Sequence, residues 1–463
     1  MPTPCAARIP TLYARWSTMC RQFIRLPLVL GTICAATACH GILDTTNPLL
    51  VRDKDLTNPS GAEGRRSWFI YSWQDAFQRT AHDVALFTDE ESIDLSPDGF
   101  SAQNPDIILD TRDTAGMQSA NVAGQDDPYL HPQTQAFWLS TLAIEAQKKY
   151  GSPTLKEDYV AELFALRGHI ALQLAETMCA GFPLNDVTTD GQPLFGTALT
   201  TDSALHYAAA QFDSVFAHVK DSTQFANLGR VLKGRALLDL GQYAAAAAAV
   251  QEVPDNFVYV PELISGNINP FVYGELINFD PSSQAYFLSD GEGGNGLHYV
   301  SEHDTIRAPN VYLQQRNSEP ADSMFVQNIY RTGTTPIPVA SGREARLIRM
   351  EAAYQAGDPS WFTTLNALRT EAGLTAILAV PATDTGKVNL IFHERAFWLL
   401  RTGHRLGDMR RLISRYGRAP ESVFPTGDYA IFDLKYGAAT ALHFVTQLQT
   451  TYNPHITHGC TAP

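Results

Sequence analysis

The densest group of side chains that could perform chemistry lies in the run HERAFWLLRTGHRLGDMRRL, residues 393–412. His404 and Asp408 are four residues apart, so they would share one face of a helix, where they could act together in catalysis. Charged and apolar side chains alternate along the whole run, and ion pairs that lock two helices together explain that alternation without catalysis. We therefore interpret this signature segment as structural, with six principal members: Glu394, Arg395, His404, Arg405, Asp408 and Arg410.

Three other patterns could bind a cofactor or a metal. The run GEGGNG at 291–296 matches G-x-G-x-x-G, but a dinucleotide site also needs a preceding strand and a following helix, so we interpret it as a flexible loop. His455, His458 and Cys460 could bind zinc, but a fourth ligand is missing. The acidic stretch 89–98 lacks the carboxylate spacing of a calcium loop. We interpret that stretch as a solvated loop, with a loop-bound calcium ion as the alternative, and predict no cofactor and no metal site.

Motifs of common enzyme classes are missing from the sequence. It has no G-x-S-x-G, no H-E-x-x-H and no phosphate-binding P-loop. Carboxylates such as Asp126 and Asp127 are adjacent in sequence, which does not place them across a substrate as glycosidase chemistry requires. Nothing in the sequence therefore supports glycosidase chemistry.

Composition sets the broad class of protein. The chain has 463 residues, of which 44% are hydrophobic, so it can bury a large core. Its net charge of −14 repels phosphate backbones, which argues against nucleic-acid binding. No run of 18 apolar residues is present, so the sequence predicts no membrane-spanning helix.

The first 38 residues have the pattern of an export signal. Four arginines precede a short apolar run at 26–36, and small residues lead to Cys39 in Ala36-Thr37-Ala38-Cys39. This pattern resembles the lipobox of bacterial lipoproteins, in which the cysteine is lipidated and becomes the mature N-terminus. We predict a signal peptide at 1–38, lipidation of Cys39 and an extended tether at 39–62; translation could begin at Met1 or Met19. A plain secretory signal is the alternative.

Cysteine usage agrees with export. Three of the six cysteines lie in the leader, and lipidation would occupy Cys39. Cys179 and Cys460 then remain as a pair in an oxidising compartment. We predict that they form a disulfide.

The elements that position these residues are mostly helical. Periodic apolar residues predict helices at 63–88, 132–150, 157–180, 203–219, 225–240, 242–251, 343–356, 359–372, 388–401 and 404–416. Gly, Pro, Asn and Ser dominate 255–341, so we predict long loops with a few short strands there. Residues 95–130 and the tail 418–463 are predicted to be irregular.

An internal repeat predicts how the helices pack. The residues Gly234, Leu237, Gly241, Tyr243, Ala246 and Val250 have tetratricopeptide spacing, and AAYQAG at 352–357 echoes ALLDLG at 236–241. We predict a mainly α fold in which tetratricopeptide-like hairpins form a superhelical scaffold at 63–254 and 342–417. One domain, 63–463, would contain that scaffold, the loop-rich insertion 255–341 and the tail.

Several motifs together resemble the SusD/RagB family. The signature segment reads E-R-x-x-x-L-x-x-x-G-H-R-x-x-D-x-R-R, which is similar to the family's C-terminal pattern. Four further segments resemble family motifs in the family's order: CHGILDTTNP at 39–48, residues 166–184, EARLIRMEAA at 344–353 and LNALR at 365–369. The central segment of the chain has no such match.

The resemblance implies an outer-membrane lipoprotein that faces the cell exterior and is held to the membrane by its lipid alone. Such a protein captures a nutrient, often an oligosaccharide, and covers a SusC-like TonB-dependent transporter. It is a binding protein and not an enzyme. Two alternatives stay open: a helical-repeat scaffold that binds other proteins, and a surface glycan hydrolase.

If the protein captures an oligosaccharide, its site needs aromatic platforms and polar partners, because sugar C–H faces are apolar while sugar hydroxyls need hydrogen bonds. We predict the ligand face in 255–341, helped by the 63–88 helix. The candidate aromatic residues are Tyr273, Tyr299 and Tyr312, with Trp73 behind them. For Trp73 we favour a place in the core over a place on the ligand face.

Overall fold

The structure is a computed structural model that describes residues 56–93, 105–119, 127–261, 286–315, 323–330, 335–429 and 433–460. Within these ranges no helix is long and apolar enough to cross a membrane. The first described helix, α3 (Pro59–Phe87), begins four residues before the predicted start, because Asn58 caps it by accepting a hydrogen bond from Gly61 N at 3.0 Å.

The other long helices lie where the apolar periodicity predicts them. Side chains of Thr200, Ser222, Ser341 and Thr383 cap four of them at the N-terminus, which explains where those helices start. These helices are α6 (His131–Tyr150), α7 (Lys156–Thr177), α8 (Thr201–His218), α9 (Thr223–Asp239), α10 (Tyr243–Ala249), α12 (Gly342–Gln355), α13 (Ser360–Glu371), α14 (Asp384–Trp398) and α15 (Arg405–Tyr416).

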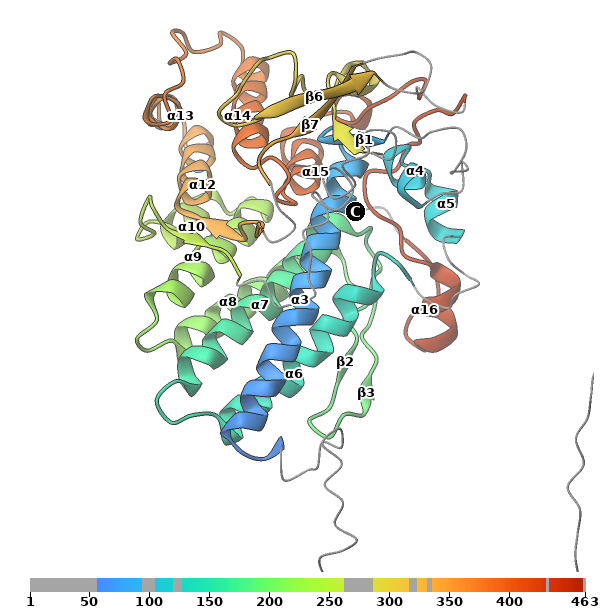
Figure 1. Cartoon of the computed structure of the whole chain (residues 1–463), viewed down its shortest axis with the longest axis vertical. Coiled ribbons are helices and arrows are strands. Elements are labelled where there is room, and N and C mark those ends of the chain that lie inside the picture. Colours follow the sequence, from blue (N-terminus) through green and yellow to red (C-terminus); the bar gives the residue numbers. More distant parts are fainter. Residues whose placement is uncertain are drawn as a thin grey trace, which may run out of the picture. The chain divides into compact units, whose positions relative to one another are not determined.

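The helices pack in pairs, α3 with α6, α7 with α8, α9 with α10, and α12 with α13 (Figure 1). The two repeats found in the sequence form the same turn. Gly241 and Gly357 have φ of +72° and +70°, and the residue after each glycine donates to a carbonyl five residues back, at 2.8 and 2.9 Å. Gly234 permits the close approach of α10, since a Cβ there would lie 2.4 Å from Val250 Cγ1. The predicted mainly α fold with helical hairpins is confirmed.

Short strands occur in and around the loop-rich insertion. In that insertion β4 (Val258–Tyr259) pairs with β8 (Ala340–Ser341), so the insertion leaves and re-enters the scaffold at one place. The β6 (Asn310–Gln315) and β7 (Ser323–Gln327) strands form an antiparallel pair. Two further pairs join β1 (Glu91–Ile93) with β5 (Tyr286–Leu288), and β2 (Asp186–Val187) with β3 (Pro193–Leu194).

Two regions predicted as irregular contain short helices. Residues 95–130 include α4 (Pro105–Asp110) and α5 (Thr114–Ser119), and the tail includes η4 (Pro420–Ser422) and α16 (Thr446–Tyr452). Helices of one or two turns carry too little periodicity to be recognised. The tail is held by buried Phe424, Leu442 and Phe444, which join the main core with helices α3 and α6 to α10.

Candidate ligand-binding face and its supports

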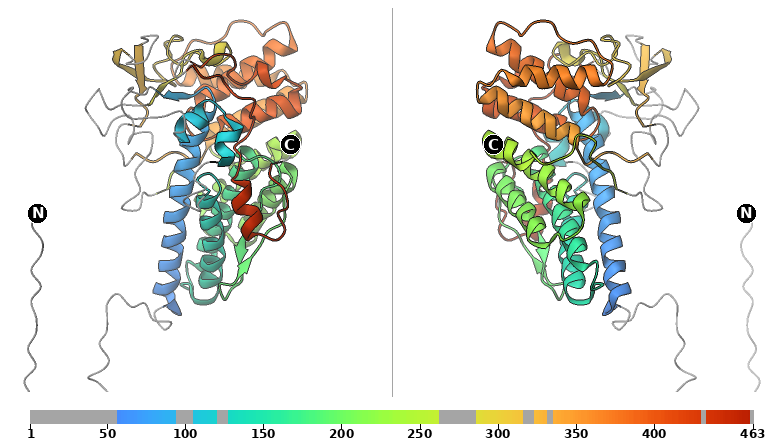
Figure 2. Two further views of the ribbon diagram at one scale, coloured as in Figure 1. Left: turned by 90° about the vertical axis from the view of Figure 1, so that its right-hand side faces the viewer. Right: turned by 90° about the vertical axis from the view of Figure 1, so that its left-hand side faces the viewer.

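The β6–β7 hairpin carries the one predicted platform residue that is exposed among the described residues. Figures 1 and 2 place this hairpin at the same end as α13 and α14. The Tyr312 side chain is 53% exposed and faces its cross-strand partner Phe325, with ring centroids 5.5 Å apart in an edge-to-face arrangement. The neighbouring Val311 is also exposed. An exposed aromatic face held by a second ring is suited to stacking against a sugar.

Two of the four candidate aromatic residues belong to the core: Tyr299 was wrongly predicted as a platform, and Trp73 takes the core position favoured above. Trp73 is fully buried, stacks on Phe77 and donates from Nε1 to His169 Nδ1 at 3.3 Å. Tyr299 is fully buried and packs on Phe397, with ring centroids 5.0 Å apart. A ring without exposed surface cannot stack on a ligand. Tyr273 lies outside the described residues, as does the lipidation site Cys39.

The acidic stretch after α3 is buried, which corrects the prediction of a solvated loop for its first three residues. Asp89 accepts two hydrogen bonds from the Arg405 guanidinium at 2.7 and 2.8 Å, and a third from Leu297 N at 2.7 Å. Glu91 lies 3.2 Å from Arg401 Nη2, and Glu90 accepts from Arg401 N at 3.1 Å. Asp89 therefore ties the loop-rich insertion to α15.

Glu394 makes a second tie between the insertion and the scaffold. Its carboxylate accepts from Arg307 in the insertion at 2.7 Å and from Arg369 at the end of α13 at 2.6 Å. Burial would raise the pKa of Glu394, but neighbouring His393 and the two arginines outweigh burial and lower it. A charged Glu394 therefore fixes Arg307, which also lies over the rings of Phe397 and Trp398.

The centre of the signature segment is a buried ion-pair network between α12, α14 and α15. Asp408 accepts from Arg395 Nε and Nη2, both at 2.8 Å, and from Arg411 Nη2 at 2.8 Å. Arg411 also donates to Glu351 at 2.9 and 3.0 Å and to Asp239 at 2.6 Å. Burial would raise the pKa of Asp408, but the two arginines hold it well below its usual range.

His404 and Arg410 are buried beside this network. His404 Nε2 lies 2.9 Å from Arg235 Nη1 and 3.1 Å from Glu344 Oε1, and burial together with Arg235 lowers the pKa of His404. Arg410 donates to the carbonyl groups of Ala175 and Met178 at the end of α7, at 2.9 and 3.1 Å. Burial lowers the pKa of Arg410 to about 10. The alternative in which His404 and Asp408 act together in catalysis finds no support in these contacts.

The glycine-rich run 291–296 is a tightly packed turn, which corrects its interpretation as a flexible loop. Its first glycine, Gly291, has a left-handed φ of +75°, and a Cβ on Gly293 would lie 2.4 Å from Thr426 N. A 3₁₀ turn, η3 (Glu292–Gly294), follows β5, where a dinucleotide site needs a long helix. Asn295 Nδ2 donates to the carbonyl of Phe424 at 2.8 Å, so the turn is fixed against the tail.

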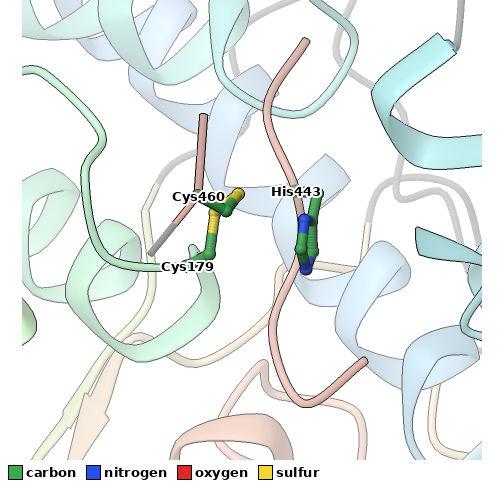
Figure 3. A group of neighbouring side chains, drawn as sticks. All are labelled: Cys179, His443 and Cys460. Atoms are coloured by element: carbon green, nitrogen blue, oxygen red, sulfur yellow. A yellow bond between two sulfur atoms is a disulfide. The ribbon is translucent and has the colours of Figure 1, made fainter. Parts of the chain in front are cut away.

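Cys179 and Cys460 are joined by a disulfide, with their Cα atoms 5.4 Å apart (Figure 3). The bond ties the tail to the end of α7. His455 and His458, the other residues of the H-x-x-H-x-C pattern, are exposed on the tail. His443 is instead the histidine that lies beside the two cysteines.

Sequence reasoning missed the carboxylates that partner the signature arginines, because they lie far away in the chain. Asp89, Glu351 and Asp239 come from three different elements. The signal available was an excess of arginine over acid in the signature segment, which requires distant counter-charges if that segment is buried.

Known structures share this fold over most of their length. The chain matches a SusD superfamily protein from Bacteroides thetaiotaomicron VPI-5482 at 14% identity, covering 86% of this chain and 99% of that one, with a TM-score of 0.63. It matches surface glycan-binding protein A from Bacteroides thetaiotaomicron at 11% identity, covering 88% and 99%, with a TM-score of 0.62. It matches a SusD-like carbohydrate binding protein from Bacteroides vulgatus ATCC 8482 at 13% identity, covering 86% of this chain and 97% of that one, with a TM-score of 0.58.

No protein-family model and no curated protein matches the sequence. At these identities the structural likeness establishes the fold, and it confirms the SusD-like architecture that the motifs predict.

Proposed function

We propose that the protein is a surface lipoprotein that binds an oligosaccharide at the loop-rich face and passes it to a TonB-dependent outer-membrane transporter. The observation that carries this proposal is the SusD-like fold, which extends over 86–88% of the chain in the structures compared above. Those structures are described as carbohydrate- or glycan-binding proteins or as members of the SusD superfamily.

The aromatic pair Tyr312 and Phe325 supports a sugar as the ligand. A sugar ring presents an apolar face of C–H groups that packs on an aromatic ring, while its hydroxyls bond to polar neighbours. Tyr312 offers such a ring on a hairpin whose insertion is fixed to the scaffold by the Leu297–Asp89 hydrogen bond and the Arg307–Glu394 ion pair. Fixing the face before binding lowers the entropy cost of ligand capture.

Binding without hydrolysis is part of the proposal. Asp408 accepts hydrogen bonds from Arg395 and Arg411. Asp127 accepts hydrogen bonds from Leu130 N at 3.0 Å and Val445 N at 2.7 Å. Both carboxylates are buried and stabilise the fold, whereas glycoside hydrolysis needs two carboxyl groups that face each other across a cleft.

The proposed location rests on the N-terminal pattern, and the proposed partner rests on the resemblance to the SusD/RagB family. Lipidation of Cys39 after export would anchor the protein to the outer membrane, with no other membrane attachment. A SusC-like barrel transporter is the proposed receiver of the ligand.

Calorimetric titration with oligosaccharides tests the proposed site. Tyr312→Ala should weaken binding by about 1–3 kcal/mol, the usual effect of removing a contact residue that carries binding energy, while the melting temperature changes little. The matched control is Tyr452→Ala, because Tyr452 is 57% exposed on α16, outside the loop-rich insertion. Equal affinity in both variants would place the site away from the hairpin.

A further inference from the structure

The disulfide region contains a third potential metal ligand beside its two sulfur atoms. The Sγ atoms of Cys179 and Cys460 and a ring nitrogen of His443 all lie within 4.8 Å of one another (Figure 3). Ideal zinc bonds of about 2.3 Å to sulfur and 2.0 Å to nitrogen place tetrahedral ligand atoms roughly 3.5–3.8 Å apart. Opening the disulfide and rotating the side chains would therefore bring the three atoms to coordination distances.

Backbone pairing fixes two of the three residues beside each other. Cys179 N donates to the carbonyl of Leu442 at 2.9 Å, and Leu442 N donates to the carbonyl of Thr177 at 2.8 Å. His443 follows directly in the chain, and the buried side chains of Phe444 and Val445 hold that segment in the core. The arrangement is therefore preorganised by the fold, since it does not depend on the disulfide alone.

The imidazole of His443 is held in place by a side chain of another element. Coordination requires the neutral form of the ring, with one nitrogen unprotonated. One ring nitrogen, Nδ1, lies 3.2 Å from Gln118 Nε2, so the amide of α5 orients the ring. With its amide turned so that Oε1 faces Nδ1, Gln118 would accept a hydrogen bond from Nδ1–H and leave Nε2 of His443 for the metal, which is the usual arrangement behind a histidine ligand.

We propose that Cys179, Cys460 and His443 form a zinc site when the disulfide is reduced. A dithiol reductant supplies two electrons and two protons, becoming a disulfide itself, and leaves two thiols. Zinc then binds both sulfurs as thiolates and the neutral imidazole, with release of the two thiol protons. His443 and Cys460 are partly exposed, so a water molecule can reach the fourth position.

This site keeps the tail attached in either redox state. In the oxidised form the covalent bond joins Cys460 to α7, and in the reduced form the metal makes the same connection through two thiolates and one imidazole. Two thiolates with an imidazole favour a thiophilic cation such as zinc over calcium or magnesium.

The experiment uses the full chain with Cys5, Cys20, Cys34 and Cys39 changed to Ser, which leaves Cys179 and Cys460 as its only cysteines. The protein is reduced with a phosphine without oxygen, the reductant is removed, and Co²⁺ is added as a spectroscopic probe before competition with Zn²⁺. We expect one equivalent of cobalt, with a thiolate-to-metal charge-transfer band that zinc abolishes. The oxidised protein should show no such band.

Two variants separate the proposed site from chance thiol binding. His443→Ala should weaken zinc binding by about 10-fold or more, since a ligand matters at least as much as the groups that orient ligands. His206→Ala, which removes an exposed histidine of α8, should leave the affinity unchanged. Absence of stoichiometric binding in the reduced protein, or equal affinity in His443→Ala, would overturn the proposal.

A second measurement covers the case in which reduction unfolds the chain. In a glutathione redox buffer, zinc should increase the fraction of reduced Cys179–Cys460 at equilibrium, because it binds only the dithiol form. His443→Ala should abolish most of that increase. An equal response to zinc with and without His443 would show that the imidazole takes no part.

Discussion

Removing Asp408 is the sharpest perturbation of the buried network that holds α14 against α15. Its carboxylate accepts three hydrogen bonds of 2.8 Å, two from Arg395 and one from Arg411. After Asp408→Ala, Arg411 still has ion pairs with Glu351 and Asp239. Among the described residues, the ion-pair partner that remains for Arg395 is Glu351, at 3.6 Å. Breaking a buried pair usually costs 3–5 kcal/mol, and because Arg411 stays paired we expect about 3–4 kcal/mol.

This loss converts into a modest change in melting temperature because the folded unit is large. A unit of about 410 residues has an unfolding entropy of roughly 0.9 kcal/mol/K, so the loss corresponds to about 3–5 °C. Thermal unfolding followed by circular dichroism measures it. The control is Asp75→Ala, which removes an exposed partner of Arg79 and should cost only about 0–1 kcal/mol.

The pH dependence adds a second test of the same reasoning. Arg395 and Arg411 hold the pKa of Asp408 below its unfolded value, despite burial that would raise it. The stabilisation is therefore complete above the unfolded pKa of about 4 and is lost as the pH falls below it. Asp408→Ala should lack that part of the acid-induced loss. A melting temperature equal to that of Asp75→Ala, or loss of ligand binding without loss of stability, would refute the structural role.

Three further predictions address the anchor, the disulfide and alkaline stability. Cys39→Ser should move the protein from the membrane to the soluble fraction on cell fractionation; unchanged partitioning would contradict lipidation. Replacing Cys179 and Cys460 by Ser should cost about 2–5 kcal/mol, measured by denaturant unfolding, because a bond across 281 residues restricts the unfolded chain; equal stability would contradict the bond in exported protein. Burial would lower the pKa of His82, but Glu91 at 3.2 Å outweighs burial and raises it to about 9. The stabilisation of the folded state by this ion pair should therefore decline as the pH rises from 6.5 to about 9. His82→Gln should lack that decline. Parallel pH profiles of unfolding free energy for this variant and the unsubstituted protein would contradict a stabilising His82–Glu91 pair.

Local patterns in the sequence predict the helical scaffold well. Apolar periodicity and capping residues such as Ser341 fix helix positions, and the glycines of the two repeats adopt the left-handed turn that only glycine takes readily. These features depend on residues a few positions apart, so they can be recognised without knowing the fold.

The ligand face was harder to predict because exposure is a property of the tertiary structure. Tyr299 and Tyr312 lie in the same irregular stretch, yet one ring packs on Phe397 and the other faces solvent. The sequence likewise suggests that Asp89 is a solvated acid, whereas in the folded protein it is paired with Arg405 of α15. Distant partners decide each of these cases, and one sequence contains no direct record of them.

Equilibrium binding of a panel of oligosaccharides to the purified protein tests the central claim most directly. A saturating ligand at 100 times its dissociation constant contributes about 2.7 kcal/mol, which corresponds to roughly 3 °C for a unit of this size. We predict that at least one oligosaccharide raises the melting temperature by that amount, is recovered intact, and loses affinity with Tyr312→Ala. Hydrolysis of the panel, or a protein that no oligosaccharide stabilises while peptides or proteins bind it, would contradict the account.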